Sequence, residues 1–222
     1  MGIVAHTGLN IPIGQRVIGA HGTTIESALQ YEIKRKRGRR ARILDAREKM
    51  FAERVLSLAG EDSHILDVPC GTGRFSSIFT RCRKLTMVDM ASNMLAVAQN
   101  KVRHSDRVKV ILGDIRKLPL DDNSVDVGFC MRLFHYIPDN ESRLVILREL
   151  ARVCSKYVAF SFYNGECFRY KWRMKRRRTV RGQYIKAKEM TELCRQAKLT
   201  RINKYPSINI MEQECFFICQ PY

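Results

Sequence analysis

Residues 63–76, SHILDVPCGTGRFS, are a short apolar run followed by a turn that contains two glycines. Gly71 and Gly73 allow the backbone to turn sharply and to approach a ligand closely. The match to the dinucleotide pattern G-x-G-x-x-G is poor, because Ser76 stands at the third glycine and Pro69 lacks an amide that could hold a phosphate. The segment therefore predicts a buried strand leading into either a cofactor loop without a phosphate site or a purely structural tight turn.

Short apolar runs and amphipathic stretches alternate along the rest of the chain. The runs are HILDV, KLTMVDM, VKVILGD, VDVGFCM, YVAFSFY, TRINKYPSI and ECFFICQ, and helices are expected at residues 74–81, 92–102, 142–153 and 186–197. This alternation is typical of a mostly parallel sheet covered by helices on both faces, a three-layer α/β/α sandwich. The last two runs are joined by a link too short for a crossover helix, so we expect them to be antiparallel.

The N-terminal quarter of the chain has a different pattern. Residues 1–22 show no clear period and are expected to form an arm, and residues 23–58 are expected to be helical and basic, with Gly38 dividing two helices. We therefore divide the chain into an arm and basic helical cover, residues 1–58, and a core, residues 59–222, with a basic and aromatic insertion at about 163–185.

Composition limits the class of protein. The 222 residues are 45% hydrophobic and 28% charged, which suits one globular domain. The sequence shows no apolar run long enough to span a bilayer and no pattern of a secretion signal. The eight cysteines include no CxxC pair, so we expect reduced thiols, a cytoplasmic location and no metal site.

Acidic side chains follow successive strands of the expected sheet, at the edge where ligands bind in α/β folds. Asp89 ends the second run, sixteen residues after Gly73, where a carboxylate can accept from both hydroxyls of a ribose. Asp114 ends the third run and can accept from an adenine amine, while Ile115 covers one face of the ring. A glycine turn followed by these two acids predicts an adenosine pocket.

The stretches LDVPCGTGRFS, MVDMASNML, LGDIRKLPLDDNSVD and FCMRLFHYIPDNESRLVILRELARV resemble the successive motifs of class I S-adenosylmethionine-dependent methyltransferases, in the group called methyltransferase type 11. The resemblance covers about residues 62–160. It implies a Rossmann-like fold with a seven-stranded sheet whose last strand is antiparallel, and S-adenosylmethionine as cofactor. It also implies a cofactor site made of Asp67, Cys70, Gly71 and Gly73 at the methionine part, Asp89 and Met90 at the ribose and adenine, Asp114 and Ile115 at the adenine, and Met131 at the sulfonium, with Arg74 as a further cofactor-binding residue. Pro69 departs from the usual glycine.

The fourth and fifth strands end in side chains that could assist methyl transfer. The candidate catalytic residues are His135, Tyr136, Arg132 and Tyr163. Histidine titrates near neutrality and could remove a proton from the acceptor, although a packing role for His135 is an equal alternative. We expect Tyr163 to line the wall of the site rather than to act as a base. The chain shows neither an Asn/Asp-Pro-Pro-Tyr/Phe stretch nor a Pro-Cys pair after the fourth strand, which argues against amide and cytosine C5 methylation.

The net charge of +18 is concentrated in two segments. Residues 34–49 carry nine basic residues and two acids, Asp45 and Glu48, whereas residues 169–188 carry ten basic residues and no acid. The rest of the chain is nearly neutral. Both segments belong to the expected cover of the sheet edge where ligands bind, so they indicate an anionic acceptor or surface. The simpler alternative is that the charged side chains only face solvent.

The second basic segment, CFRYKWRMKRRRTVRGQ, alternates aromatic and cationic residues. In an extended conformation this would place the aromatics on one face, where they could stack on bases, enter a lipid headgroup region or cap the protein's own core. The expected substrate-binding residues are Arg169, Trp172, Arg176, Arg177 and Arg178.

Together these features predict methyl transfer to an O or N atom of an anionic small molecule, glycan or lipid precursor. An RNA methyltransferase acting on tRNA is the leading alternative, and a non-catalytic binding module is a third. The protein could also associate peripherally with an anionic membrane surface through the two segments.

Overall fold

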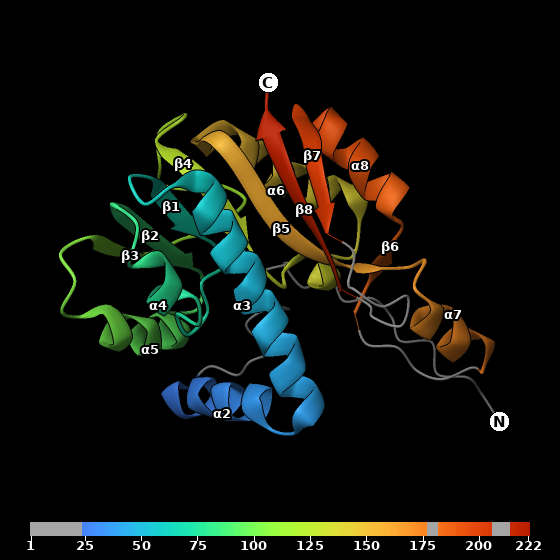
Figure 1. Ribbon diagram of the computed structural model, residues 1–222, viewed down its shortest axis with the longest axis horizontal. Coiled ribbons are helices and arrows are strands. Elements are labelled where there is room, and N and C mark those ends of the chain that lie inside the picture. The colour runs from blue at the N-terminus through green and yellow to red at the C-terminus, as the bar shows by residue number, and fades with distance from the viewer. Residues whose placement is uncertain (1–23, 177–181, 206–213) are drawn as a thin grey trace.

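The computed structural model describes residues 24–176, 182–205 and 214–222. These residues form one twisted sheet with the strand order β3-β2-β1-β4-β5-β8-β7, and β6 pairs with the end of β5 (Figure 1). The strands are β1 (His64–Asp67), β2 (Lys84–Asp89), β3 (Val108–Leu112), β4 (Val125–Cys130), β5 (Cys154–Asn164), β6 (Tyr184–Ile185), β7 (Leu199–Tyr205) and β8 (Glu214–Pro221). All pairings are parallel except those of β8, which is antiparallel to both β5 and β7.

The described helices are α2 (Ile25–Lys36), α3 (Arg39–Ala59), α4 (Ser76–Phe79), α5 (Ser92–Val102), the 3-10 turn η1 (Phe134–Tyr136), α6 (Asn140–Val153), α7 (Phe168–Lys175) and α8 (Ala187–Gln196). Side chains of α3, α4 and α5 share one buried cluster with one face of the sheet. Side chains of α6 and α8 share another cluster with the opposite face. Figure 1 shows α2 and α7 beyond the ends of the strands, at the edge where the parallel strands finish.

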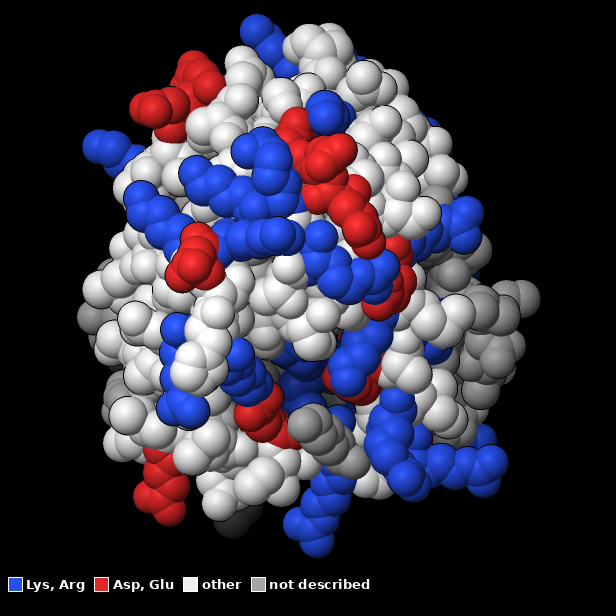
Figure 2. Space-filling view, turned by 60° about the vertical axis from the view of Figure 1, so that its left-hand side comes forward, with Lys and Arg blue, Asp and Glu red and all other residues white. Residues whose placement is uncertain are grey.

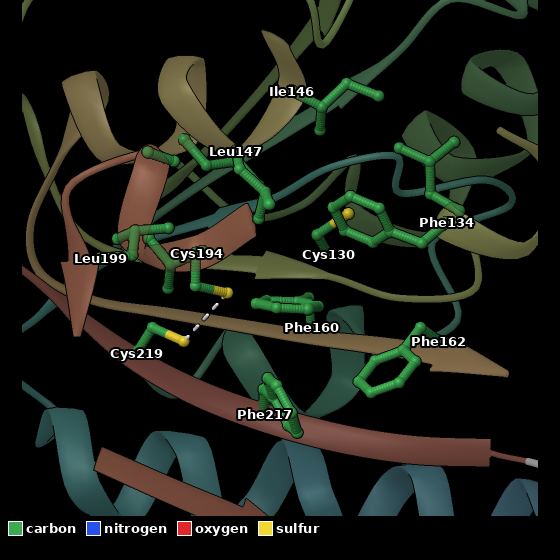
Figure 3. Close-up of a cluster of buried hydrophobic side chains, with 14 of the residues drawn as sticks. Cys130, Phe134, Ile146, Leu147, Phe160, Phe162, Cys194, Leu199, Phe217 and Cys219 are labelled. Carbon is green, nitrogen blue, oxygen red and sulfur yellow. Dashed lines mark hydrogen bonds between the residues drawn. The ribbon is translucent and has the colours of Figure 1, made fainter. Parts of the chain in front are cut away.

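Strand alternation explains how the sheet separates the two clusters. In β5, Ala159 faces the α3 side and Phe160 faces the α6 side; in β8, Phe216 and Phe217 divide in the same way. The ring of Phe217 meets those of Phe160 and Phe162 edge to face in the α6 cluster, and the centroids of Phe162 and Phe217 lie 4.9 Å apart (Figure 3). This packing fixes β5, which carries the residues of the candidate site at its end.

The thiols also belong to the core. All eight cysteines are buried and free, and the Sγ atoms of Cys194 and Cys219 lie 3.8 Å apart (Figure 3). They act as small apolar side chains here.

The expected three-layer fold with an antiparallel last strand is confirmed, and Gly38 does separate two helices. One local expectation was wrong, and two features of the structure were not expected. The helix expected at residues 74–81 shortens to α4, because the glycine loop continues through Phe75. The short β6 adds an eighth strand. The basic aromatic segment forms helix α7 instead of an extended stretch. The expected arm, residues 1–22, lies outside the described residues.

Candidate active site

The glycine loop connects β1 to α4 and is held by the neighbouring strand. The amide of Cys70 donates to the Val88 carbonyl at 2.9 Å, and the amide of Gly71 donates to Oδ2 of Asp89 at 2.7 Å. Gly71 and Gly73 both have positive φ, +54° and +71°. A Cβ on Gly71 would meet only open space, whereas one on Gly73 would lie 2.9 Å from Cε of Met87. The loop is therefore packed against the core at Gly73 and open at Gly71, where a ligand can approach the backbone.

Asp67 is the last residue of β1 and lies beneath this loop, 1% exposed. Neither of its carboxylate oxygens has a hydrogen-bond partner within the part of the chain that the structure describes. The pKa of Asp67 is raised to about 8, because burial outweighs the opposing charge of Arg74 and the charge of Asp89 acts in the same direction as burial. A buried, unpartnered carboxyl is costly, so this position suits a ligand that brings a positive charge or hydrogen-bond donors.

Asp89 and Asp114 lie at the ends of neighbouring strands, as the sequence predicts. Asp89 accepts hydrogen bonds from the amides of Gly71 and Ala91. The amide of Gly113 donates to the Asp89 carbonyl at 3.0 Å, so the two strand ends are adjacent. Asp114 is bound through both oxygens by Arg116, which lowers its pKa despite partial burial. Met90 and Ile115, beside these acids, are partly buried.

A cavity of about 420 Å³ opens between the glycine loop and helices α2 and α3. Of the predicted cofactor residues, five line it: Cys70, Gly71, Gly73, Arg74 and Met131. The other five, Asp67, Asp89, Met90, Asp114 and Ile115, do not. The cover contributes Tyr31, Glu32 and Arg35 from α2 and Asp45 and Lys49 from α3. On this face Lys and Arg side chains lie against Asp and Glu side chains around a hollow in the lower half of the molecule (Figure 2).

The cover is tied to the loop by one fully buried carboxylate, Glu48 of α3. It pairs with Arg35 of α2 at 2.6 Å, with Arg132 after β4 at 3.1 Å, and with Arg74 of the loop. Burial alone would raise the pKa of Glu48, but the three guanidinium charges lower it. Arg74 also pairs with Asp45 at 2.9 Å and stacks on Phe75. Arg74 thus faces the cover as much as the cavity.

The four predicted catalytic residues come together at the ends of β4 and β5. Arg132 has a φ of +58° and donates to the Tyr163 hydroxyl at 3.1 Å. The ring of His135 is stacked on Tyr163, with centroids 4.0 Å apart, and lies 4.2 Å from the ring of Tyr136. His135 is 3% exposed. The structure brings these four side chains together, and their catalytic role stays a prediction.

Glu214, the first residue of β8, completes this cluster and was not predicted. It accepts from Ser161 at 2.9 Å and lies 3.7 Å from Arg132. Burial, and then the charge of Glu48, raise the pKa of Glu214. Of the two acids Glu48 and Glu214, Glu214 is therefore the one that is protonated at neutral pH.

A helical period in the sequence could have revealed Glu48 and Asp45. With Ala52 and Val55 they fall at i, i+3, i+7 and i+10, on the buried stripe of α3. The charge count alone shows both acids only as part of a basic segment. Glu214 could have been placed at the ligand edge from the antiparallel direction of the last strand.

Helix α7 belongs to the second basic segment, and its Arg169 lies near Arg40, which follows the turn at Arg37 and Gly38 that joins α2 to α3, the α2–α3 elbow. Burial, then the charges of Arg40 and Arg173, lower the pKa of Arg169, so these cations are neighbours. Tyr170 is stacked on Tyr184 at 4.2 Å, and Arg176 lies over Trp172 at 4.4 Å. Arg177 and Arg178 lie outside the described residues.

The described residues lack two features that would suggest other kinds of site. Within them, no three His, Cys, Asp or Glu side chains are grouped to hold a metal ion. None of the described helices combines the length and apolar character needed to cross a membrane.

Comparisons with known proteins agree with this geometry. Residues 65–156 match the family described as methyltransferase domain. Residues 65–156 of this chain are thus similar to a methyltransferase domain, and the chain has the fold of S-adenosylmethionine-dependent methyltransferases. The domain is 34% identical over 114 residues to demethylmenaquinone methyltransferase of Staphylococcus aureus, which is 47% of this chain and 45% of the relative. The match therefore spans about half the length of the curated relatives.

Solved structures show the same methyltransferase fold. Magnesium protoporphyrin IX methyltransferase from Synechocystis PCC 6803 with bound SAM superposes with a TM-score of 0.73 and 11% identity, covering 97% of this chain and 100% of that chain. A SAM-dependent methyltransferase from Aquifex aeolicus has a TM-score of 0.59 and 21% identity, covering 77% and 89%. The resemblance read from the motifs is confirmed at the level of fold and domain family.

The residues of this methyltransferase domain fit its cofactor. S-adenosylmethionine is positively charged at its sulfur and at its amino group, and the buried carboxyl of Asp67 has no partner within the described residues. Gly71 leaves open space for a close ligand. We therefore keep the predicted cofactor residues as the hypothesis for this site.

Proposed function

We propose that the protein is a cytoplasmic enzyme that methylates an O or N atom of an anionic acceptor, a small molecule, glycan or lipid precursor, held between the α2–α3 elbow and α7. The group of cations around Arg169 is the observation that supports an anionic acceptor. Its Nε atom is buried and has no hydrogen-bond partner among the described residues. Arg40 and Arg173 lie near it, and residues 169–188 include no acid.

Burial, and then the neighbouring charges of Arg40 and Arg173, lower the pKa of Arg169. In the first basic segment, Glu48 pairs with Arg35 and Asp45 pairs with Lys49, and both acids also pair with Arg74 of the glycine loop. The Nε atom of Arg169 in α7, by contrast, has no hydrogen-bond partner among the described residues. A phosphate or carboxylate on the acceptor would satisfy it through charge-assisted hydrogen bonds.

The transfer itself would use the cluster after β4 and β5. When bound, S-adenosylmethionine supplies a methyl group on a positively charged sulfur, which the acceptor atom displaces in line. Arg132 holds the Tyr163 hydroxyl, and Tyr163 covers His135. In this proposal Tyr163 forms the wall that orients the acceptor, and His135 receives a proton where the acceptor must lose one.

The proposal is tested with cofactor labelled on the methyl group and a cell extract separated into small-molecule, lipid, glycan, RNA and protein fractions. Label is expected in an anionic small molecule, glycan or lipid. Arg169→Gln should lower transfer at limiting acceptor by roughly 10- to 100-fold, the worth of a lost charge-assisted hydrogen bond. Its affinity for S-adenosylhomocysteine should not change. Arg148→Gln, on the exposed side of α6, is the matched control. An equal loss in both variants would contradict the placement of the acceptor.

A tRNA methyltransferase is the second candidate, favoured by the concentration of the +18 charge in two neighbouring segments. It predicts label in RNA and an affinity for tRNA that falls steeply as salt rises. Label confined to RNA would replace the first candidate by the second.

A further inference from the structure

Helix α7 has two faces that differ in their surroundings. Tyr170, Arg169 and Arg173 point along one side, where Tyr170 is stacked on Tyr184. Phe168, Lys171, Trp172 and Lys175 follow one another at i, i+3, i+4 and i+7, so they share the other side. No residue of α7 is buried, and Phe168 is 51% exposed. We call this side, Phe168, Lys171, Trp172 and Lys175, the outer face of α7.

The outer face combines large aromatic rings with flexible ammonium groups. Lys171 and Lys175 are exposed, and Arg176, also exposed, follows at the end of the helix. No acid occurs from Cys167 to Lys188. Rings flanked by lysines are the composition of a helix that lies in the headgroup region of a bilayer, with the rings in the interface and the cations on anionic headgroups.

We propose that the outer face of α7 docks on the surface of an anionic phospholipid bilayer. Figure 1 shows α7 at the edge of the molecule, clear of both layers of helices that cover the sheet. The helix lies at the same edge as the glycine loop, so docking would bring the candidate active site to the membrane surface. This inference concerns a surface that the proposed methyl transfer does not use, and the two can fail separately.

The contacts of the aromatic side chains favour a bilayer over RNA as the occupant. A base-stacking surface needs several rings that offer open faces in one direction. In α7, Tyr170 is stacked on Tyr184, and Arg176 covers Trp172. Phe168 alone of these three rings is more than half exposed. The extended arrangement that would have aligned the rings for successive bases is replaced by a helix, which turns Tyr170 to the opposite side.

The test uses the full chain and two kinds of vesicle, phosphatidylcholine alone and phosphatidylcholine with phosphatidylglycerol. The protein is expected to sediment with the second kind only. Trp172 is the only tryptophan, so its emission reports on α7 directly and should shift to shorter wavelength on binding. Lys171→Gln with Lys175→Gln should lower the partition coefficient roughly 30-fold, at about a factor of five for each lysine. Phe168→Ser should lower it as well.

The matched control removes two charges from the opposite edge of the sheet, Arg148→Gln with Lys198→Gln, and should bind vesicles as the unchanged protein does. Calorimetry with S-adenosylhomocysteine shows that each variant is folded. Failure to sediment with anionic vesicles overturns the proposal, as does an equal loss in the control. Binding of tRNA that depends on Lys171 and Lys175, without vesicle binding, would assign the face to nucleic acid. Self-association that depends on Phe168, without vesicle binding, would assign it to a second copy.

Discussion

Two carboxylates, Asp67 below the glycine loop and Glu48 above it, are almost equally buried, at 1% and 0% exposure, but they have opposite surroundings. Glu48 is paired with three arginines from three different segments. Asp67 has no hydrogen-bond partner in the described parts of the chain. Burial dominates the pKa of Asp67 and raises it, whereas the arginines overcome burial and lower the pKa of Glu48.

This difference separates a structural role from a binding role. Glu48 has its partners within the protein and holds the cover, α2 and α3, over the loop. Asp67 belongs to the floor of the site, and the partner that would satisfy it must come from outside. The cover is therefore held by charge, and the floor is held by packing around Gly73 and is left open to a ligand.

The largest expected effect is on the cover. Glu48→Gln leaves Arg35, Arg74 and Arg132 without their shared partner, and breaking a buried ion pair in this way costs about 3–5 kcal/mol. Urea unfolding of the unliganded protein measures it. Glu53→Gln on the same helix is the control, because Glu53 pairs with Arg81 where both side chains are about half exposed, and should cost less than about 1 kcal/mol. Similar losses for the two variants would contradict the role of Glu48.

The second effect tests the packing of the floor. Gly73→Ala combines a positive φ with a Cβ 2.9 Å from Met87 and 3.2 Å from Ala98, and should cost about 2–4 kcal/mol. Gly71→Ala has the positive φ without the crowding, and should cost about 1–2 kcal/mol. Thermal or urea unfolding of the two variants side by side gives the difference. If Gly71→Ala were the more damaging, the loop would not be packed as described.

How far the sequence predicts this site depends on whether an interaction is local. Asp67, Gly71, Gly73 and Asp89 were predicted because strand ends and a glycine turn are local patterns, and the structure does place them at one edge. The tie from Glu48 to Arg132 joins residues 84 apart in sequence, and no local pattern shows that they meet. The α7 segment was ambiguous, since alternating aromatic and basic residues suit a strand. The spacing of Phe168, Lys171, Trp172 and Lys175 suits a helix equally well.

The effect of Asp67→Asn is expected in the pH dependence of stability. The pKa of Asp67 is about 8 in the folded protein and near 3.8 when unfolded, so the unfolded state binds fewer protons between these values. Asp67 therefore makes the stability fall as pH rises from about 4 to about 8. In Asp67→Asn this part of the slope should disappear, while Glu214, whose pKa is also raised, keeps its own part. Unfolding in urea at several pH values tests the change, and an unaltered slope would contradict the raised pKa.

The most direct test of the account is calorimetry of the unchanged protein with S-adenosylhomocysteine at pH 7, in two buffers of different ionisation enthalpy. We expect binding, with release of up to about one proton as the ligand's amino group lowers the pKa of Asp67. In Asp67→Asn the affinity should fall roughly 10- to 100-fold, with no proton released. Absence of binding at high micromolar concentration would contradict the cofactor site, and binding that Asp67→Asn leaves unchanged would contradict the role of this carboxyl.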